Sequence, residues 1–281
     1  MNPQSLRMSL GHATIVTLGT ALPPALGVFG RLEVLLRRPD TGLDDIVSLV
    51  RIDPGLTFQL IKLANSALFG LRSRCDSLEE AVARVGFGDI HQLVGLAVSR
   101  GTFQRALDQY DIACGRLWEN SVATGLLAAE LAGAAGADSR SAYATGLLRP
   151  LGRVVLNNSV GAVRYPGEAD APDVHAWERT TYGLSAADAS AILLDHWRFA
   201  PEAVSAVRQH RAPDGAGAAR LHLAARLAEA WGCGLPGEAA GWRDDDLLAL
   251  AAVPREDVEP AAARARKKFS ACAQIEWSQA A

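Results

Sequence analysis

The sequence predicts an all-α fold. Apolar residues recur at i, i+3, i+4 and i+7 over most of the 281 residues, and no sustained period-2 pattern typical of strands is found. Many of these stretches begin with helix-start signals, a Ser, Thr or Asp followed by an acidic residue or a proline. Apolar residues make up 49% of the chain, which allows a large core and excludes extensive disorder.

The first half reads as short helices behind a loosely ordered lead-in at residues 1–17. Four helix starts are expected, at Pro23-Pro24, at a Thr41–Asp44 capping box, at Asp53-Pro54 and at a Ser77–Glu80 capping box. Pro39-Asp40 stops the first of these helices, and Gly86 ends the fourth.

Longer amphipathic stretches fill the rest of the chain. They are expected at about 89–107, 116–136, 141–157, 173–183, 186–197, 201–210, 217–231, 244–252 and 259–273. Weak boundaries near Tyr110 and at the Pro/Gly-rich patch Leu235–Glu238 divide the chain after the lead-in. The resulting segments are an N-terminal lobe (18–110), a second helical lobe (111–234) and a C-terminal helical extension (235–281).

Composition narrows the environment and the partners. The net charge of −3 gives no overall electrostatic case for nucleic acid or an anionic membrane. Four cysteines lie apart without a CxxC pair, so free buried thiols in a reducing compartment are expected. No uncharged apolar run is long enough to span a bilayer, and Met8–Val28 lacks the pattern of a signal peptide. A cytoplasmic protein without membrane contact is therefore predicted.

Several short motifs of the first half occur in a specific order: Leu22-Pro23-Pro24, Asp53-Pro54-Gly55-Leu56-Thr57, Leu63-Ala64-Asn65-Ser66-Ala67, Phe69-Gly70 and Ser77-Leu78-Glu79-Glu80-Ala81-Val82. They resemble the HDOD family, a non-enzymatic output domain of bacterial signalling proteins related to HD-type phosphohydrolases. The resemblance covers about residues 18–212 and implies a bundle of short helices packed on an HD-like helical lobe. Asn65-Ser66 is expected to be a polar staple at a helix–loop–helix corner, in preference to a direct binding role.

The second half resembles the HD lobe, so its metal ligands can be checked position by position. The resemblance places the first histidine at Asn120, the His-Asp doublet at Arg149-Pro150 and the last aspartate at Ala225. A guanidinium is permanently charged and has no lone pair to offer, and proline and alanine have no side-chain ligand atom. We expect neither a metal cofactor nor hydrolysis, and no other cofactor.

Arg149 and Arg153 lie one helical turn apart and admit two interpretations. Two cations on one face suit an anionic ligand such as a nucleotide phosphate, with Glu178 and His210 as further contacts. Alternatively, Arg149 pairs with a buried carboxylate, for example Glu178, while Arg153 is solvated. The second interpretation is favoured because buried charges generally persist by pairing.

Three functional hypotheses follow. The favoured one is a non-catalytic bacterial signalling output or scaffold module that binds a regulatory protein, with a homodimer left open. The second is a sensor that binds a nucleotide, for instance a cyclic dinucleotide, in the former metal pocket. The third is nucleic-acid binding through the C-terminal helices, whose basic end contains Arg264, Arg266, Lys267 and Lys268. The third is disfavoured because no recognition motif accompanies the basic residues.

Overall fold

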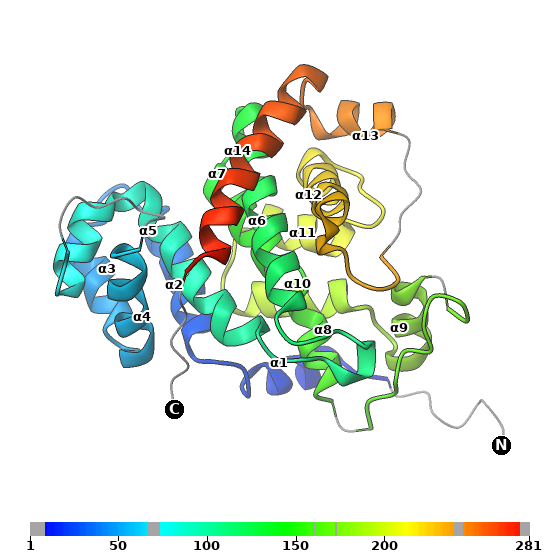
Figure 1. Cartoon of the computed structure of the whole chain (residues 1–281). Helices are drawn as coiled ribbons and strands as arrows, with labels where there is room; N and C mark the ends of the chain where they lie inside the picture. Colours follow the sequence, from blue (N-terminus) through cyan, green and yellow to red (C-terminus); the bar gives the residue numbers. More distant parts are fainter. Residues whose placement is uncertain (1–8, 67–73, 160, 172, 239–243, 276–281) are drawn as a thin grey trace.

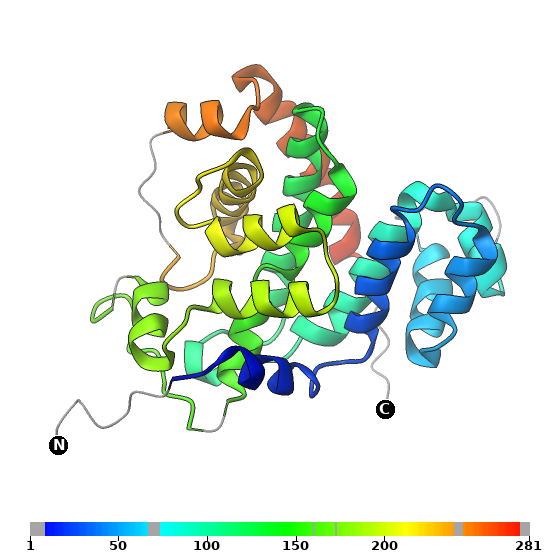
Figure 2. The ribbon, with the colours of Figure 1, turned by 180° about the vertical axis from the view of Figure 1, so that it is seen from behind.

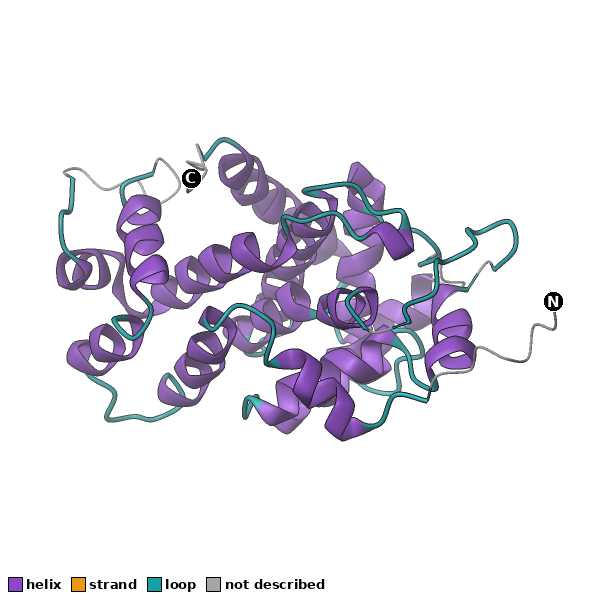
Figure 3. Cartoon of the chain, turned by 90° about the horizontal axis from the view of Figure 1, so that it is seen from below, coloured by secondary structure: helices purple, strands orange, loops and turns teal. Residues whose placement is uncertain are grey.

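The fold consists of helices and their connections, which confirms the all-α prediction (Figures 1 and 3). The computed structural model describes residues 9–66, 74–159, 161–171, 173–238 and 244–275. Over these ranges the only pairing of extended backbone is a single antiparallel bridge between Leu107 and Ile112. None of the described helices is both long and apolar enough to cross a lipid bilayer.

The smaller lobe, drawn in blue and cyan at the left of Figure 1, contains α2 (Ala25–Leu35), α3 (Leu43–Val50), α4 (Pro54–Ala64) and the first part of α5 (Leu78–Phe103). Asp53 caps α4 as predicted, because its Oδ1 accepts a hydrogen bond from Leu56 N at 2.9 Å. The helix of α5 is interrupted at Gly86, whose φ of +80° favours glycine. Beyond this break, α5 continues into the larger lobe.

The larger lobe is built around α6 (Arg116–Ala134), against which α7 (Ser139–Leu148), α12 (Ala216–Ala228) and α14 (Arg255–Ala273) pack. Figure 2, seen from behind, brings α10 (Ala186–His196) and α11 (Pro201–Gln209) to the near side. The other elements are α1 (His12–Gly19), α8 (Leu151–Asn157), α9 (Val174–Tyr182), α13 (Asp244–Ala251) and two short helical turns, η2 (Asp108–Tyr110) and η3 (Glu229–Cys233).

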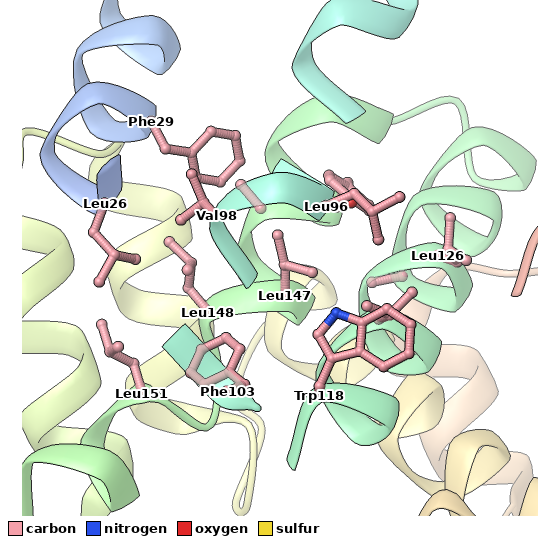
Figure 4. Close-up of a cluster of buried hydrophobic side chains, with 14 of the residues drawn as sticks. Leu26, Phe29, Leu96, Val98, Phe103, Trp118, Leu126, Leu147, Leu148 and Leu151 are labelled. Carbon is pink, nitrogen blue, oxygen red and sulfur yellow. The ribbon is translucent and has the colours of Figure 1, made fainter. Parts of the chain in front are cut away.

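One hydrophobic core joins the two lobes (Figure 4). Leu26 of α2 lies near Leu148 of α7 and Leu151 of α8, whereas Phe29 of α2 lies beside Val98 of α5, and all of these side chains are buried. Because each apolar face is covered by a helix of the other lobe, the lobes are expected to depend on each other for burial.

The expectation of a loosely ordered lead-in was wrong for residues 12–19. These residues form α1, which packs against α8 and α10. Ile15 is fully buried, and Leu10 N donates a hydrogen bond to Tyr182 O at 2.8 Å. The helix has no side-chain cap and buries only Ile15, so its sequence carries little of the periodic signal that identifies a helix.

The capping box predicted at Thr41–Asp44 is displaced by one residue. Gly42 is the N-cap of α3, and the Asp45 carboxylate accepts from Gly42 N at 2.8 Å. The Thr41 hydroxyl donates instead to Leu35 O, which ties the end of α2 to the turn.

The C-terminal helix and one thiol also differ from expectation. The helix predicted over 259–273 begins one turn earlier, at Arg255, and continues through Pro260, which lies inside the helix. Cys75, Cys233 and Cys272 are free and buried as expected, whereas Cys114 is free and exposed.

Candidate functional site

The candidate site lies at the corner between α7 and α8. Pro150 has no N–H and ends the hydrogen-bond ladder of α7, so the single helix predicted over 141–157 is two helices. Ser190 of α10 stabilises the corner: its Oγ donates to Arg149 O at 2.8 Å and accepts from Gly152 N at 2.7 Å. Nothing in the residues around Ser190 singles it out, since a lone serine among alanines has no motif.

Two glycines flank this corner and allow neighbouring helices to approach it. A Cβ atom at Gly146 would lie 2.7 Å from the Cα of Gly125 in α6, and one at Gly152 would lie 1.9 Å from Ala186 O. Both separations are shorter than atoms can tolerate, so a larger residue would push the helices apart. The glycines at positions 146 and 152 are thus explained by packing.

Arg149 is held by side chains from three other segments. Its Nη2 donates to Asn120 Oδ1 at 2.6 Å, and its Nη1 donates to the two carboxylate oxygens of Glu238 at 2.9 and 3.0 Å. The same Nη1 lies 3.4 Å from Nε2 of His210. Asn120 is fixed in turn, because its Nδ2 donates to Cys233 O at 2.8 Å. Asn120 and Arg149, two of the former ligand positions, are therefore in direct contact.

Arg153 is buried, which corrects the expectation that it is solvated. Its side chain is 1% exposed, and its Nη2 lies 3.0 Å from Glu238 Oε1 and donates to Pro236 O at 3.2 Å. Its Nε lies 3.9 Å from Glu178 Oε1. Arg149 does pair with a carboxylate, but the suggested partner Glu178 was wrong: Arg149 pairs with Glu238, and Glu178 lies beside Arg153.

Glu238 is the site residue that sequence reasoning missed. Two contacts fix the segment that carries it: Gly237 N donates to Glu168 Oε1 at 2.7 Å, and Arg211 Nη1 donates to Glu238 O. Burial alone would raise the pKa of Glu238, yet the charges of Arg149 and Arg153 hold it well below its ordinary value. In the sequence it is one acidic residue after a Pro/Gly-rich patch, a pattern too common to indicate a site.

Three histidines line the same interior. Nδ1 of His210 lies 2.7 Å from Val207 O, so this nitrogen carries the proton and Nε2 is the acceptor that faces Arg149. Burial, followed by the charge of Arg149, lowers the pKa of His210 well below its usual value. Burial also lowers the pKa of His222, and the ring of His175 lies edge-on to that of His210. The arginines, and not His210, therefore supply the positive charge at neutral pH.

Glu178 closes the other side of the cluster and is fully buried. Its Oε2 accepts from Ala186 N at 2.7 Å, and its Oε1 accepts from the Tyr110 hydroxyl at 3.0 Å. Burial and the neighbouring Glu178 raise the pKa of Tyr110 well above its ordinary value. Glu178 thus joins α9 to the start of α10 and is also a counter-charge for Arg153.

Comparison with known proteins identifies the family. The sequence profile of the HDOD domain matches residues 22–213. The chain belongs to the HDOD family. A protein of Treponema pallidum, named only as uncharacterised, is 32% identical to this HDOD chain over 186 residues, or 64% of the chain. The chain spans about a third (35%) of the length of that relative.

Solved structures share the HDOD fold at low sequence identity. A candidate phosphohydrolase from Shewanella amazonensis superposes with a TM-score of 0.68 at 22% identity, covering 95% of this chain and 100% of its own. An HDOD domain protein from Geobacter sulfurreducens gives 0.67 at 18% identity with the same coverage, 95% and 100%. A candidate signal transduction protein from Marinobacter aquaeolei gives 0.67 at 20% identity, covering 97% of this chain and 67% of its own. These similarities confirm the fold.

The four former ligand positions of this HDOD protein do not form a metal-binding donor set. Asn120 and Arg149 are hydrogen-bonded to each other, and Pro150 is buried at the corner. Ala225 is half-buried on α12, which reaches the cluster through His222. Among the described residues, no group of three or more His, Cys, Asp or Glu side chains is placed to hold a metal ion. A guanidinium within the cluster cannot coordinate a cation, so the residues present do not fit a divalent metal.

The first-lobe motif of the HDOD family has a structural role in the described residues. Asn65 Nδ2 donates to Cys75 O at 2.8 Å, and its Oδ1 accepts from Cys75 N at 2.8 Å, so one amide side chain closes the connection between α4 and α5. Ser66 Oγ donates to a backbone carbonyl one turn earlier. This is the staple that the sequence favoured. The motif residues Phe69 and Gly70 lie outside the described residues.

Proposed function

We propose that this HDOD protein is a non-catalytic signalling module that acts by binding a regulatory protein. The observation that carries the proposal is the buried cluster at the former metal site. There Arg149 donates to Asn120 and to Glu238, so the one possible ligand atom among the four positions, Asn120 Oδ1, already accepts a hydrogen bond from a guanidinium. The scaffold of a hydrolase without its metal ligands retains a rigid surface through which a protein can signal.

The solved structures that share this fold are named both as signalling proteins and as hydrolases. The solved structures with this fold include a candidate signal transduction protein and a candidate phosphohydrolase. A sequence identity near 20% indicates a shared fold but not a shared reaction. The choice between the two functions therefore rests on the residues of the site. They favour signalling because Arg149 provides a permanent positive charge but no exchangeable coordination position.

We place the proposed partner surface at the corner between α3 and α4, where two large apolar side chains are exposed. Ile52 is 60% exposed and Phe58 is 66% exposed, and only five residues separate them in the sequence. Hot-spot contacts of protein–protein interfaces are often aromatic, so Phe58 is the residue of this corner that we choose to test. The helices α3 and α4 are on the smaller lobe, apart from α8 and α9 of the larger lobe (Figure 1).

A turnover assay tests the absence of catalysis. The purified protein is incubated with p-nitrophenyl phosphate and bis(p-nitrophenyl) phosphate in the presence of Mn²⁺, Mg²⁺ or Ni²⁺, and an HD phosphohydrolase with intact ligands serves as the positive control. We expect hydrolysis no faster than in buffer. Metal-dependent turnover comparable to that of the positive control would contradict the proposal.

A binding assay tests the partner surface. Cross-linking in the native host identifies candidate partners, and affinity is then measured with each purified candidate. Replacing Phe58 with serine is expected to weaken binding at least tenfold, since loss of a central aromatic contact costs about 2 kcal/mol or more. Phe87→Ser, which alters a 44% exposed aromatic on α5, is the matched control and is expected to bind like the wild type. Equal effects of the two substitutions would exclude the α3–α4 corner.

A further inference from the structure

The two buried arginines have more hydrogen-bond donors than their partners use. Among the described residues, Nε of Arg149 and Nη1 of Arg153 have no hydrogen-bond acceptor, although the two side chains are only 2% and 1% exposed. Neither ring nitrogen of His175, at the same site, makes a hydrogen bond, although its Nδ1 lies 3.3 Å from Glu178 Oε2. A buried donor without an acceptor costs roughly 1–3 kcal/mol, so several in one place call for an explanation beyond packing.

The position of Glu238 indicates what the donors could receive. Arg149 Nη1 contacts both of its oxygens, and Arg153 Nη2 contacts Oε1 at 3.0 Å, so two guanidiniums hold a single carboxylate. A phosphoryl group carries more charge and more acceptor oxygens than a carboxylate, and could accept from the donors that Glu238 leaves unused. Arginine is also the side chain best suited to bidentate recognition of phosphate.

We infer that Arg149 and Arg153 form a binding site for a phosphate monoester or a diphosphate, and that Glu238 occupies this site as an internal competitor. The inference stands independently of the proposed protein partner. It concerns the phosphoryl group, whether that group belongs to free phosphate or to a nucleotide.

The charge balance explains why the ligand has to displace Glu238. Arg149 and Arg153 are balanced by Glu178 and Glu238, so a further anion has no net positive charge to attract it while both carboxylates remain. Glu238 is 12% exposed, whereas Glu178 is fully buried, so Glu238 is the carboxylate with access to solvent. A tethered competitor acts at an effective concentration of the order of millimolar, which weakens but does not prevent binding of a multiply charged ligand.

Calorimetry with matched variants tests the site. Inorganic phosphate, pyrophosphate and GMP are titrated into the wild type and into Glu238→Gln at equal ionic strength, set with chloride. Removal of the competing charge is expected to tighten pyrophosphate binding by about tenfold or more. Adding Arg149→Met to Glu238→Gln is expected to abolish this gain. Glu168→Gln, which alters the carboxylate bonded to Gly237 N, is the control and is expected to bind like the wild type.

The outcomes separate the alternatives. Equal gains for pyrophosphate and GMP identify the phosphoryl group itself as the ligand, and a larger gain for GMP identifies a nucleotide. Binding to Glu238→Gln that is no tighter than to the wild type, or a gain that survives Arg149→Met, would overturn the inference.

A second measurement on the wild type keeps the test decisive if Glu238→Gln does not fold. Displacement of Glu238 by pyrophosphate is expected to weaken the neighbouring bond from Gly237 N to Glu168 and to speed amide hydrogen exchange in the peptide that contains Gly237. Unchanged exchange at up to about 20 mM pyrophosphate, well above the effective concentration of the competitor, would also overturn it.

Discussion

Arg149 places a positive charge where the family resemblance positions a metal, but it binds its neighbours in a different way. Its guanidinium donates hydrogen bonds to Asn120 and Glu238, whereas a metal ion would accept lone pairs from its ligands. A neutral amide at position 120, in place of a histidine, suits this reversal because its Oδ1 can accept from Arg149. The changes at the former ligand positions are therefore chemically consistent with one another.

Removal of the Glu238 carboxylate is expected to destabilise the protein strongly. Glu238→Ala leaves the buried Arg149 without a carboxylate and Arg153 with Glu178 alone, and breaking such a pair from one side costs about 3–5 kcal/mol. Urea denaturation followed by circular dichroism measures the change in the free energy of unfolding. Glu229→Ala, at an exposed glutamate, is the control and is expected to change stability by less than about 0.5 kcal/mol. An equally small effect of Glu238→Ala would show that the ion cluster contributes little to the free energy of unfolding.

The free energy of unfolding is expected to decrease as the pH is lowered, because His210 is buried in its neutral form. Burial and the charge of Arg149 lower the pKa of His210 in the folded protein, whereas a histidine in the unfolded chain takes up a proton at about pH 6.5. The stabilisation is complete above that pH and is lost progressively as the pH falls towards the folded pKa, by at most about 1.4 kcal/mol per pH unit. Denaturation between about pH 7 and pH 5 is expected to show a shallower slope for His210→Gln than for the wild type. His196→Gln, at an exposed histidine, is expected to keep the wild-type slope; a wild-type slope in His210→Gln would contradict the assignment.

At the scale of elements, the corner between α7 and α8 depends on close contact with two neighbouring helices. Gly146 lies against α6 and Gly152 lies against the start of α10, and Ser190 bonds the two backbone groups left by the break at Pro150. The corner determines where Arg149 and Arg153 project. Contacts of uncharged residues therefore position the two charged side chains.

Replacement of Gly152 by alanine tests this contact. The added Cβ would lie 1.9 Å from Ala186 O, so α8 and α10 would have to separate, at a cost of about 1–3 kcal/mol or more. Gly101→Ala, in the exposed part of α5 where a Cβ meets nothing within 4 Å, is the control and is expected to stabilise the protein by about 0.5–1 kcal/mol. Thermal unfolding of the two variants gives the comparison, and shifts in the same direction would contradict the packing argument.

At the scale of the whole molecule, α14 attaches the C-terminal extension to the larger lobe. Ala261 and Ala265 are fully buried, and Glu130 of α6 accepts hydrogen bonds from Arg264 and Lys268 at 2.7 and 2.8 Å. Two of the four basic residues considered for nucleic-acid binding are therefore already paired within the protein. This pairing weakens the electrostatic argument for nucleic acid as a partner.

The continuous core predicts cooperative unfolding of the two lobes. Leu60 of α4 is fully buried in the smaller lobe, and Leu60→Ala is expected to cost about 2–5 kcal/mol. Because the core is shared, this substitution should lower the unfolding midpoint reported by tryptophan fluorescence, to which Trp118 and five tryptophans later in the chain contribute, as much as that reported by circular dichroism. Two separated transitions, with only the first shifted, would show that the lobes unfold independently.

Local sequence patterns predicted the helical class and most helix starts, and they place Arg149 where the family resemblance expects a metal ligand. Each of these depends on local periodicity, on a cap such as Asp53 or on the chemistry of one side chain such as Arg149. Only the tertiary structure showed that α1 is ordered, that Arg153 is buried and that Glu238 joins two arginines more than 80 residues away in the sequence. The physical reason is that periodicity and capping act over a few residues, whereas a buried ion pair forms between segments that only the folded core brings together.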